Sequence, residues 1–581
     1  MLNHSGDRGS AKGSGKRGAT PMEHDTVSYD RDFGRLVRDR TQSNIPVKGV
    51  YGPADIAGLD YDRDLGNPGE APFTRGIYPE MYRRNLWLKS LIVCYATPEE
   101  TNRAFKKYIA AGQTGLRVLT DTATLSGVDP DHPLARYDIM CNGNPTFALT
   151  EYETMLDGIA LEGIDFESAN STPSGSFFTY VFLVALMEKR GADISQLRGT
   201  NINDPIHAAI VYGTPEFPPD LARRVNLDLI EFGIRNTPRW HPCTPCGYDM
   251  RDAGLTSPQE MAFVIANALQ YYGDAIKERR LRFDGFRPMV FSMSAESDFF
   301  ETIAKFRATR RLWARMARER LGATTARNMA CRIGIRTAGN SIYPQKPLNN
   351  TARVTLQVLA AVLGGVQAID PSGIDETFGL PSEESRIFEL DLQHIIAHEG
   401  NVPLTADPLG GSYYVEWLTT KLETEATRLL DEIDRLGGMW KCLESGWLRQ
   451  QFDRTTTEIQ GEINDSKRLI VGANAFHGQD GAISRAIVDG AYKVPPDEKR
   501  FGAIDRVRKL RQTRDQDAVT RRLRDLADAV REQRNVLRPA IEATRAYATL
   551  GEMVGTIRLA QGLSFDPYKR IAAPEFLEHV A

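Results

Sequence analysis

The chain has 581 residues, of which 41% are apolar and 25% are charged, and its formal net charge at pH 7 is −4. This composition is ordinary for a folded protein and excludes a chain that is disordered throughout. The charge balance indicates no nucleic-acid partner, and no apolar run approaches the roughly 20 residues that cross a membrane.

The first segment, to about residue 40, is rich in Gly, Ser, Lys, Arg and Asp and has few large apolar side chains. It predicts a flexible arm over residues 1–45, with a short helix near residues 29–38. The arm contains basic residues but lacks the apolar segment of a secretory signal. Six cysteines in a chain of this length do not indicate a disulfide framework, so we expect a cytoplasmic protein with reduced thiols.

From residue 46 onward, short apolar runs alternate with amphipathic stretches. The runs that predict strands are 91–96, 115–120, 165–169, 199–203, 244–248, 287–294, 332–337 and 365–370. Helical patterns lie between them, at 151–161, 177–190, 258–278 and 299–320. Eight strand–helix units predict an α/β fold, a (β/α)8 TIM barrel over residues 46–420, rather than an open doubly wound sheet.

Residues 421–581 predict a C-terminal helical region. Apolar residues recur at helical spacing in 416–436, and the run 505–535 is dominated by Arg and Asp. A solvated helix with ion pairs between residues four apart would explain that charged run. A docking surface for a partner subunit would explain it as well.

Polar residues cluster at the carboxyl ends of the predicted strands, where barrel enzymes place their active sites. The ends carry Thr120, Asp121, Asn203, Asp204, Tyr248, Asp249, Ser294, Glu296, Arg336, Thr337 and Asp370. A ring of carboxylates facing one arginine needs either a ligand or mutual pairing, because an isolated buried charge is costly. The sequence therefore predicts a binding site at the mouth of the barrel.

Four segments in a fixed order carry a family resemblance: FTRGIYPEMY at 73–82, GQTG at 112–115, FFETIAKFR at 299–307 and DPLGGSYYVE at 407–416. Together they resemble the large, barrel-bearing subunit of the methylmalonyl-CoA mutase family, over about residues 72–476 and more weakly beyond. The resemblance implies a radical 1,2-rearrangement that uses adenosylcobalamin. No Asp-x-His-x-x-Gly motif occurs, so we expect a separate small cobalamin-binding subunit to supply the cobalt ligand.

The resemblance also assigns cofactor-binding residues. Glu376 matches the acid that holds the ribose of the adenosyl group, although a surface acid on a helix is the alternative. Ser372 stands where the family has asparagine, and Gly334 and Thr337 of the seventh strand are placed beside the cofactor.

Three positions are predicted to be catalytic. Tyr248 matches the active-site tyrosine of the family, but the histidine that follows it is Asp249 here, and a family glutamine is Arg336. An ionised carboxylate cannot donate a hydrogen bond to a carbonyl. Either Asp249 is protonated, or it binds a cationic or hydroxylated group. Arg336 and Asp249 would suit the carboxylate and the ammonium or hydroxyl of an amino or hydroxy acid, or they pair with each other.

The predicted substrate-binding residues are Tyr78, Met81, Asn85, Ile92, Ile202, Asn203, Tyr212 and Glu296. Tyr78 and Met81 retain an apolar wall suited to the pantetheine arm of a CoA thioester. Tyr212 replaces the arginine that pairs with the free carboxylate of methylmalonyl-CoA, and Ile92 replaces the tyrosine beside it, which argues against that substrate. Ile92 resembles the 2-hydroxyisobutyryl-CoA mutase type, which keeps the histidine and glutamine lost here.

The segment His241-Pro-Cys-Thr-Pro-Cys246 contains one Cys-x-x-Cys pair. Without a second pair at a suitable spacing, the sequence predicts no metal site there. Three interpretations of function remain: a cobalamin-dependent mutase, an inactive or regulatory paralogue, and a barrel enzyme that uses its carboxylates for acid–base chemistry without cobalamin. We favour the mutase, because Tyr248, Glu376 and the polar mouth are retained.

Overall fold

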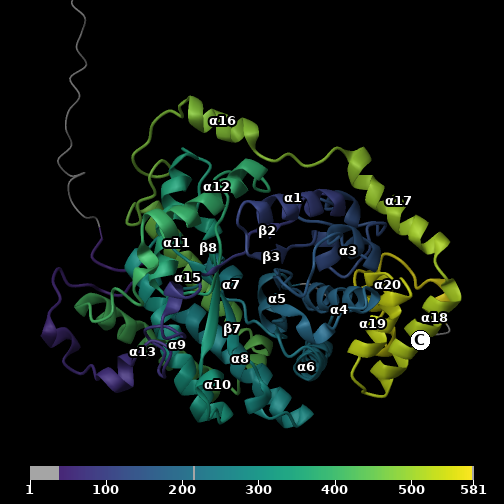
Figure 1. The fold of residues 1–581 in the computed structure, drawn as a ribbon, viewed down its shortest axis with the longest axis horizontal. Helices are drawn as coiled ribbons and strands as arrows, with labels where there is room; N and C mark the ends of the chain where they lie inside the picture. The colour runs from purple at the N-terminus through teal and green to yellow at the C-terminus, as the bar shows by residue number, and fades with distance from the viewer. Residues whose placement is uncertain (1–37, 214–215, 579–581) are drawn as a thin grey trace, which may run out of the picture.

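The computed structural model describes residues 38–213 and 216–578, in which parallel strands are surrounded by helices (Figure 1). Most of the predicted arm, with the helix expected near residues 29–38, lies outside the described residues. The last residues of the arm contact both the barrel and the C-terminal helical region. The Ser43 hydroxyl donates to Glu301 Oε1 at 2.6 Å, and Arg38 Nη1 donates to Glu462 Oε2 at 2.9 Å.

The strands form two parallel sheets. Their bounds are β1 (Leu88–Lys89), β2 (Ile92–Val93), β3 (Gly115–Val118), β4 (Asp165–Ser168), β5 (Arg198–Asn201), β6 (Trp240–His241), β7 (Met289–Ala295), β8 (Cys331–Thr337) and β9 (Ala368–Asp370). Hydrogen bonds order one sheet as β2-β3-β4-β5-β6 and the other as β1-β9-β8-β7.

Two joins turn these sheets into one closed ring. At the first, β1 and β2 are halves of a single bent strand, because β1 pairs with β9 while β2 pairs with β3. At the second, Cys246 bridges Ser292 of β7: the Gly247 amide donates to Ser292 O at 2.7 Å, and the Ser292 amide donates to Pro245 O at 3.0 Å. The predicted eight-stranded barrel is therefore confirmed, with β1 and β2 counted as one strand.

The fifth strand is where the predicted strand limits are wrong. The sequence predicts residues 244–248, whereas the ladder to β5 runs through β6 and only Cys246 bridges the next strand. Pro242 and Pro245 lack the amide hydrogen that a continuous ladder requires. Tyr248 consequently opens a short helix, α7 (Tyr248–Asp252), instead of ending a strand.

Helices cover the outside of the ring. Those between the strands are α1 (Pro98–Ala110), α2 (Thr122–Leu125), α3 (Leu149–Met155), α4 (Pro173–Lys189), α5 (Pro205–Val211), α6 (Pro219–Asn236), α8 (Ser257–Arg279), α9 (Phe299–Leu321), α10 (Ala326–Met329) and α11 (Asn349–Leu363), and α12 (Glu383–His394) follows the last strand. The helices predicted at 177–190, 258–278 and 299–320 are α4, α8 and α9. The helix predicted at 151–161 is shorter, because α3 ends at Met155 and the chain then turns through Gly158 at φ 69°.

The C-terminal helices fall into two groups (Figure 1). They are α13 (Tyr413–Arg435), α14 (Met439–Glu444), α15 (Trp447–Asn464), α16 (Ala482–Gly490), α17 (Asp497–Thr513), α18 (Gln516–Arg531), α19 (Leu537–Arg545), α20 (Leu550–Ala560) and α21 (Glu575–Glu578). The first group begins with α13, predicted at 416–436, which packs along α8 and α9. Helices α16 and α17 cross to the other end of the molecule, where α19 packs against α4.

The charged run 505–535 forms two helices rather than one, because the Asp515 side chain caps α18 by accepting from the Ala518 amide at 2.9 Å. Some arginines of this run form ion pairs with acidic residues elsewhere in the chain. Arg506 Nη2 lies 3.1 Å from Glu151 Oε2, and Arg514 Nη2 lies 2.6 Å from Glu552 Oε1. These pairs fasten α17 and the α17–α18 turn to the rest of the molecule.

Helix α4 is mostly apolar on all of its faces because it is buried on both sides. Every residue from Pro173 to Met187 is buried, because the barrel covers one face and α18 and α19 contribute apolar side chains to the same core on the other. A second core joins α8, α9 and α13 to β7 and β8. Within the described residues, no helix combines the length and the apolar character of a membrane span.

Candidate functional site

Arg336 lies at the carboxyl end of β8 between two carboxylates. Its Nη2 donates to Glu376 Oε1, and its Nε lies 3.6 Å from Asp370 Oδ2. Its guanidinium carbon is 5.6 Å from the centroid of the Tyr248 ring, within range of a cation–π contact. Burial disfavours the charged form, but Glu376, Tyr248 and Asp370 outweigh burial and raise the pKa of Arg336, so the site contains a permanent cation.

Asp370, at the end of β9, is fully buried and faces three arginines. Besides Arg336, Arg117 Nη1 lies 3.6 Å from its Oδ2 and Arg386 Nη1 lies 3.5 Å from its Oδ1. Arg117 Nη2 also lies 3.4 Å from Glu167 Oε1. Strands β3, β4, β8 and β9 therefore place compensating charges in the barrel interior, where branched apolar side chains are usual.

Asp249 forms a second cluster, one residue after Tyr248. Its Oδ2 lies 3.0 Å from His207 Nε2 and 3.4 Å from Cys246 Sγ, and the Tyr212 hydroxyl donates to the same carboxylate. Burial opposes ionisation of Asp249, but His207, Cys246 and Tyr212 outweigh burial and hold its pKa below the ordinary value. Of the two states considered from the sequence, the structure supports the ionised carboxylate.

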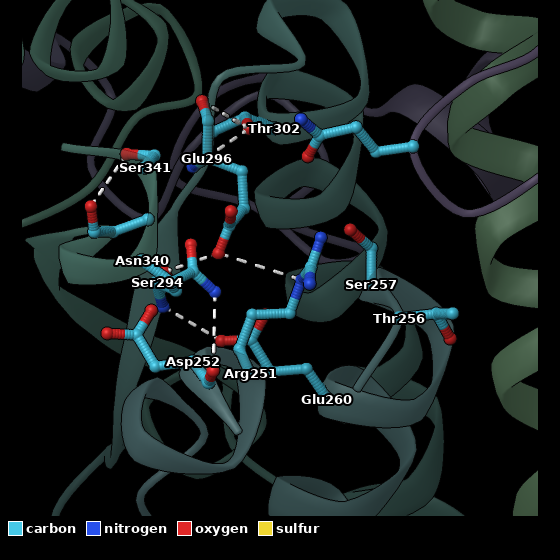
Figure 2. Close-up of polar contacts among 12 residues, drawn as sticks. Arg251, Asp252, Thr256, Ser257, Glu260, Ser294, Glu296, Thr302, Asn340 and Ser341 are labelled. Carbon is cyan, nitrogen blue, oxygen red and sulfur yellow. Dashed lines mark hydrogen bonds and ion pairs between the residues drawn. The ribbon is translucent and has the colours of Figure 1, made fainter. Parts of the chain in front are cut away.

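A third cluster joins the end of β7 to α7 (Figure 2). Glu296 Oε1 accepts from the Ser294 hydroxyl at 2.7 Å and lies 3.6 Å from Arg251 Nε, and Figure 2 shows Glu296 and Arg251 pointing toward each other. Burial and repulsion from Glu296 raise the pKa of Asp252 to about 7, although a hydrogen bond from Tyr248 opposes this shift. A carboxyl group that titrates near neutrality is thus in contact with Tyr248.

The structure excludes the pairing of Arg336 with Asp249 that the sequence left open. Arg336 contacts Glu376 and Asp370, whereas Asp249 contacts His207. The reason is their position in the fold. Arg336 projects from β8 toward the residues at and after β9, whereas Asp249 lies in the first turn of α7, which packs against α5.

The comparisons with known proteins agree with this architecture. A family model described as Methylmalonyl-CoA mutase matches residues 40–563. The chain belongs to the methylmalonyl-CoA mutase family. It is 35% identical over 520 residues to a protein of Aquincola tertiaricarbonis named 2-hydroxyisobutanoyl-CoA mutase large subunit, which covers 89% of this chain and 91% of that protein.

Two methylmalonyl-CoA mutases match at a similar level. The protein of Rhizobium meliloti (strain 1021) is 32% identical over 527 residues, and the mitochondrial protein of Homo sapiens is 31% identical over 526 residues. Each match covers 90% of this chain, together with 72% and 68% of those proteins respectively. Membership makes this chain an isomerase of the mutase class, in a family that is cobalamin-dependent.

The family-derived cofactor positions differ in accessibility. The Glu376 side chain is 23% exposed, and its Oε2 accepts from the Gly373 amide at 2.9 Å. A partly exposed carboxylate at the mouth keeps lone pairs that can accept from hydroxyl groups, which is the chemistry that the ribose role expected for Glu376 requires. Ser372 and Thr337 are fully buried and bond to each other: the Ser372 amide donates to Thr337 Oγ1 at 2.7 Å, and its hydroxyl donates to Thr337 O at 2.9 Å. Gly334 faces the interior, where an added Cβ would lie 3.9 Å from a Glu167 oxygen.

Three predicted substrate residues lie at the other end of the barrel. Tyr78, Met81 and Asn85 precede β1, so they sit at the amino-terminal ends of the parallel strands. Tyr78 and Asn85 are exposed, whereas Met81 is buried against Gly76 and Gly365. A ligand that touched both these residues and Arg336 would have to pass along the barrel axis.

The remaining predicted substrate residues lie near the mouth. Ile92 is buried, and its amide donates to Asp370 Oδ1 at 3.0 Å. Ile202 and Asn203 follow β5 and are buried, and the Asn203 side chain donates to Pro242 O at 3.2 Å. Tyr212 is 43% exposed, so of these residues it presents the largest accessible side chain.

Sequence reasoning missed His207 and the interior charges. His207 lies in α5, where a single histidine between apolar residues resembles an ordinary core residue. Arg117 and Glu167 carried a usable signal, because each alternates with apolar residues along a strand. In a barrel covered by helices, a charged residue on an alternate position points to the interior.

Proposed function

We propose that this chain is the large subunit of an adenosylcobalamin-dependent carbon-skeleton mutase. It would catalyse a radical 1,2-rearrangement of an acyl-CoA or a related carboxylic acid. The observation that carries the proposal is the grouping of Tyr248, Arg336 and Glu376 at the carboxyl ends of the strands in a mutase-family barrel.

The residues at the mouth support a division of tasks. When bound, adenosylcobalamin supplies a carbon-centred radical by homolysis of its cobalt–carbon bond. Glu376 would hold the ribose, Tyr248 would pack beside the adenosyl group, and Arg336 would orient a carboxylate of the substrate. The half-buried position of Tyr248 and Arg336 limits the access of water, which protects a reactive intermediate.

A separate small subunit would carry the cobalamin and its lower cobalt ligand. The Aquincola relative is named a large subunit, which supports this arrangement. We place the docking of that subunit in the C-terminal helical region, residues 421–581. In α16, Ile483 and Val488 are exposed apolar residues, which suits a protein contact better than water.

The substrate is not expected to be methylmalonyl-CoA. The ionised Asp249 cannot donate to a thioester carbonyl and would repel a developing oxyanion. Tyr212 offers a hydroxyl where the family has an arginine for the second carboxylate. The Tyr212 hydroxyl is engaged by Ser171 at 3.2 Å and by Asp249.

A second candidate is a mutase for a free amino or hydroxy acid. The charged interior favours it, because a carrier arm on the barrel axis would have to displace the ion pairs among Arg117, Glu167 and Asp370. A small acid could enter from the mouth and leave them intact. Arg336 and Asp249 would then meet its carboxylate and its ammonium or hydroxyl group.

The test is to combine the chain with a small cobalamin-binding subunit and adenosylcobalamin and to record cob(II)alamin absorbance as substrates are added. Acyl-CoA thioesters and free amino or hydroxy acids form the two arms of the panel. We expect a signal in one arm and its loss in Glu376→Gln. Binding of the small subunit without a signal in either arm would instead indicate an inactive or regulatory paralogue.

A further inference from the structure

Three side chains with metal-binding atoms converge beside the mouth. His207 comes from α5, Cys246 from the turn that closes the barrel, and Asp249 from α7. One ligand atom from each lies within 4.8 Å of the others. His207 and Cys246 are buried, and Asp249 keeps 22% of its side chain exposed, so the cluster is open on one side.

The geometry differs from that of an ordinary ion pair. His207 Nε2 lies 3.0 Å from Asp249 Oδ2, yet in the described part of the chain neither ring nitrogen makes a hydrogen bond of normal geometry. The carboxylate oxygen therefore lies off the N–H direction. Two atoms that are close but not aimed at each other are placed as ligand atoms are around a common centre.

The separations fit a small tetrahedral ion. Zinc bonds of about 2.0–2.1 Å to nitrogen or oxygen and about 2.3 Å to sulfur give tetrahedral edges of about 3.3 Å for N–O and about 3.5 Å for S–O. The corresponding distances here are 3.0 Å from His207 to Asp249 and 3.4 Å from Cys246 to Asp249. Two of the three edges are thus within a few tenths of an ångström of the ideal values, and the third, from His207 to Cys246, is within 4.8 Å.

One buried carboxylate positions two of the three segments. Asp204 Oδ1 accepts from the His207 amide at 3.1 Å, and Asp204 Oδ2 accepts from the Cys246 amide at 2.9 Å. Asp204 is itself held by α8, through the Asn267 amide at 3.0 and 3.1 Å and the Tyr271 hydroxyl at 2.5 Å. This support keeps the imidazole and the thiol in register without contacting the ligand atoms.

We propose that His207, Cys246 and Asp249 bind one divalent transition-metal ion of the Zn²⁺ type. One nitrogen, one sulfur and one oxygen donor favour Zn²⁺ over Mg²⁺ or Ca²⁺, which take oxygen ligands. Three protein ligands leave the fourth tetrahedral position for water or a ligand oxygen, as in catalytic zinc sites. The thiol loses its proton when the ion binds.

This assignment replaces the sequence-based expectation of no metal site, which considered Cys246 together with Cys243. The structure separates the two thiols, because Cys243 Sγ donates to Asn203 O at 3.3 Å in the core. If the proposed mutase function holds, the ion would polarise a substrate carbonyl or carboxylate oxygen. It would thus take the part of the hydrogen-bond donor that Asp249 cannot provide.

The test uses the full chain, stripped of metal with a chelator, kept reduced and free of cobalamin. Titration with Co²⁺ should give the absorbance of a tetrahedral Co²⁺–thiolate centre at one equivalent, and Zn²⁺ should displace it. Cys246→Ser should abolish the thiolate band and weaken Zn²⁺ binding by at least about tenfold. Cys243→Ser, the same change in the same turn, is the matched control and should leave both intact.

The wild-type titration decides the question even if Cys246→Ser fails to fold. Absence of a thiolate band in the wild type, or its persistence in a folded Cys246→Ser chain, would overturn the site and leave a plain His–Asp ion pair. The near-isosteric Asp249→Asn should keep a thiolate band but lower the Zn²⁺ affinity. Because these readouts do not involve turnover, their failure is distinct from failure of the mutase proposal.

Discussion

Neutralising Arg336 should destabilise the fold through the carboxylates that it compensates. Two unit charges about 4 Å apart attract each other by about 4 kcal/mol at an effective dielectric constant of about 20, and removing one partner of a buried pair costs about 3–5 kcal/mol. Asp370 keeps Arg117 and Arg386 after the change, and Glu376 is partly exposed. We therefore expect Arg336→Gln to lower the free energy of unfolding by about 3 kcal/mol.

A double-mutant cycle isolates the contact with Glu376. Arg336→Gln, Glu376→Gln and the double variant, measured by urea unfolding with circular dichroism, should show a coupling of about 2 kcal/mol. The exposed pair Lys441–Glu444, with side chains 65% and 57% exposed, is the control and should show no measurable coupling. A coupling for Arg336 and Glu376 no larger than that of the control would refute the buried-network reasoning.

Three further predictions, made with four substitutions, test other parts of the fold. Gly199→Ala should abolish soluble expression, because φ is +137° and the new Cβ would overlap a carbonyl oxygen of β4. Gly273→Ala in α8 is the control: its Cβ meets open space, so the change should raise the free energy of unfolding by up to about 1 kcal/mol. Asp252 has a folded pKa of about 7 against an ordinary 3.8, so its contribution to stability is full below about pH 4 and is lost as the pH rises through 7. The thermal midpoint of Asp252→Asn should therefore exceed that of the wild type at pH 8 and match it at pH 4, and equal midpoints at pH 8 would contradict the shift. Arg514→Gln should lower the free energy of unfolding in urea by about 3–5 kcal/mol, because the buried Glu552 then keeps only the more distant Arg511 as an ion-pair partner. An unfolding midpoint equal to that of the wild type would show that the Arg514–Glu552 pair does not stabilise the fold.

The barrel could be predicted from local patterns because most of its elements agree with them. Helices α8 and α9 carry an N-terminal capping residue and a helical apolar pattern, and both begin within a residue of the predicted start. The fifth strand could not be placed in the same way. Its pairing is divided between β6 and Cys246 around two prolines, and this division depends on the neighbouring strands rather than on local propensity.

The site was predicted as a set of polar strand ends, but not as a set of contacts. The acidic position of Glu376 and the arginine at 336 were both identified, whereas their mutual contact depends on how β8 and the segment after β9 meet. The partner of Asp249 came from a different helix. Sequence spacing gives no reason to bring His207 to that carboxylate.

The closure at Cys246 and Ser292 is the seam of the barrel with the least backbone pairing, because it is a single bridge, whereas β1–β9, β2–β3 and β5–β6 each pair two residues. Strands β7 and β8, by contrast, pair over seven consecutive residues. At the seam, two backbone hydrogen bonds, donated by the amides of Gly247 and Ser292, hold the strands together. Such a junction is expected to open before the rest of the cylinder does, and hydrogen–deuterium exchange at Gly247 should be faster than in the middle of β8. An ion bound by His207, Cys246 and Asp249 would stabilise this junction, because Cys246 is part of it. Metal binding would therefore slow hydrogen–deuterium exchange at Gly247 and reduce local opening of the barrel.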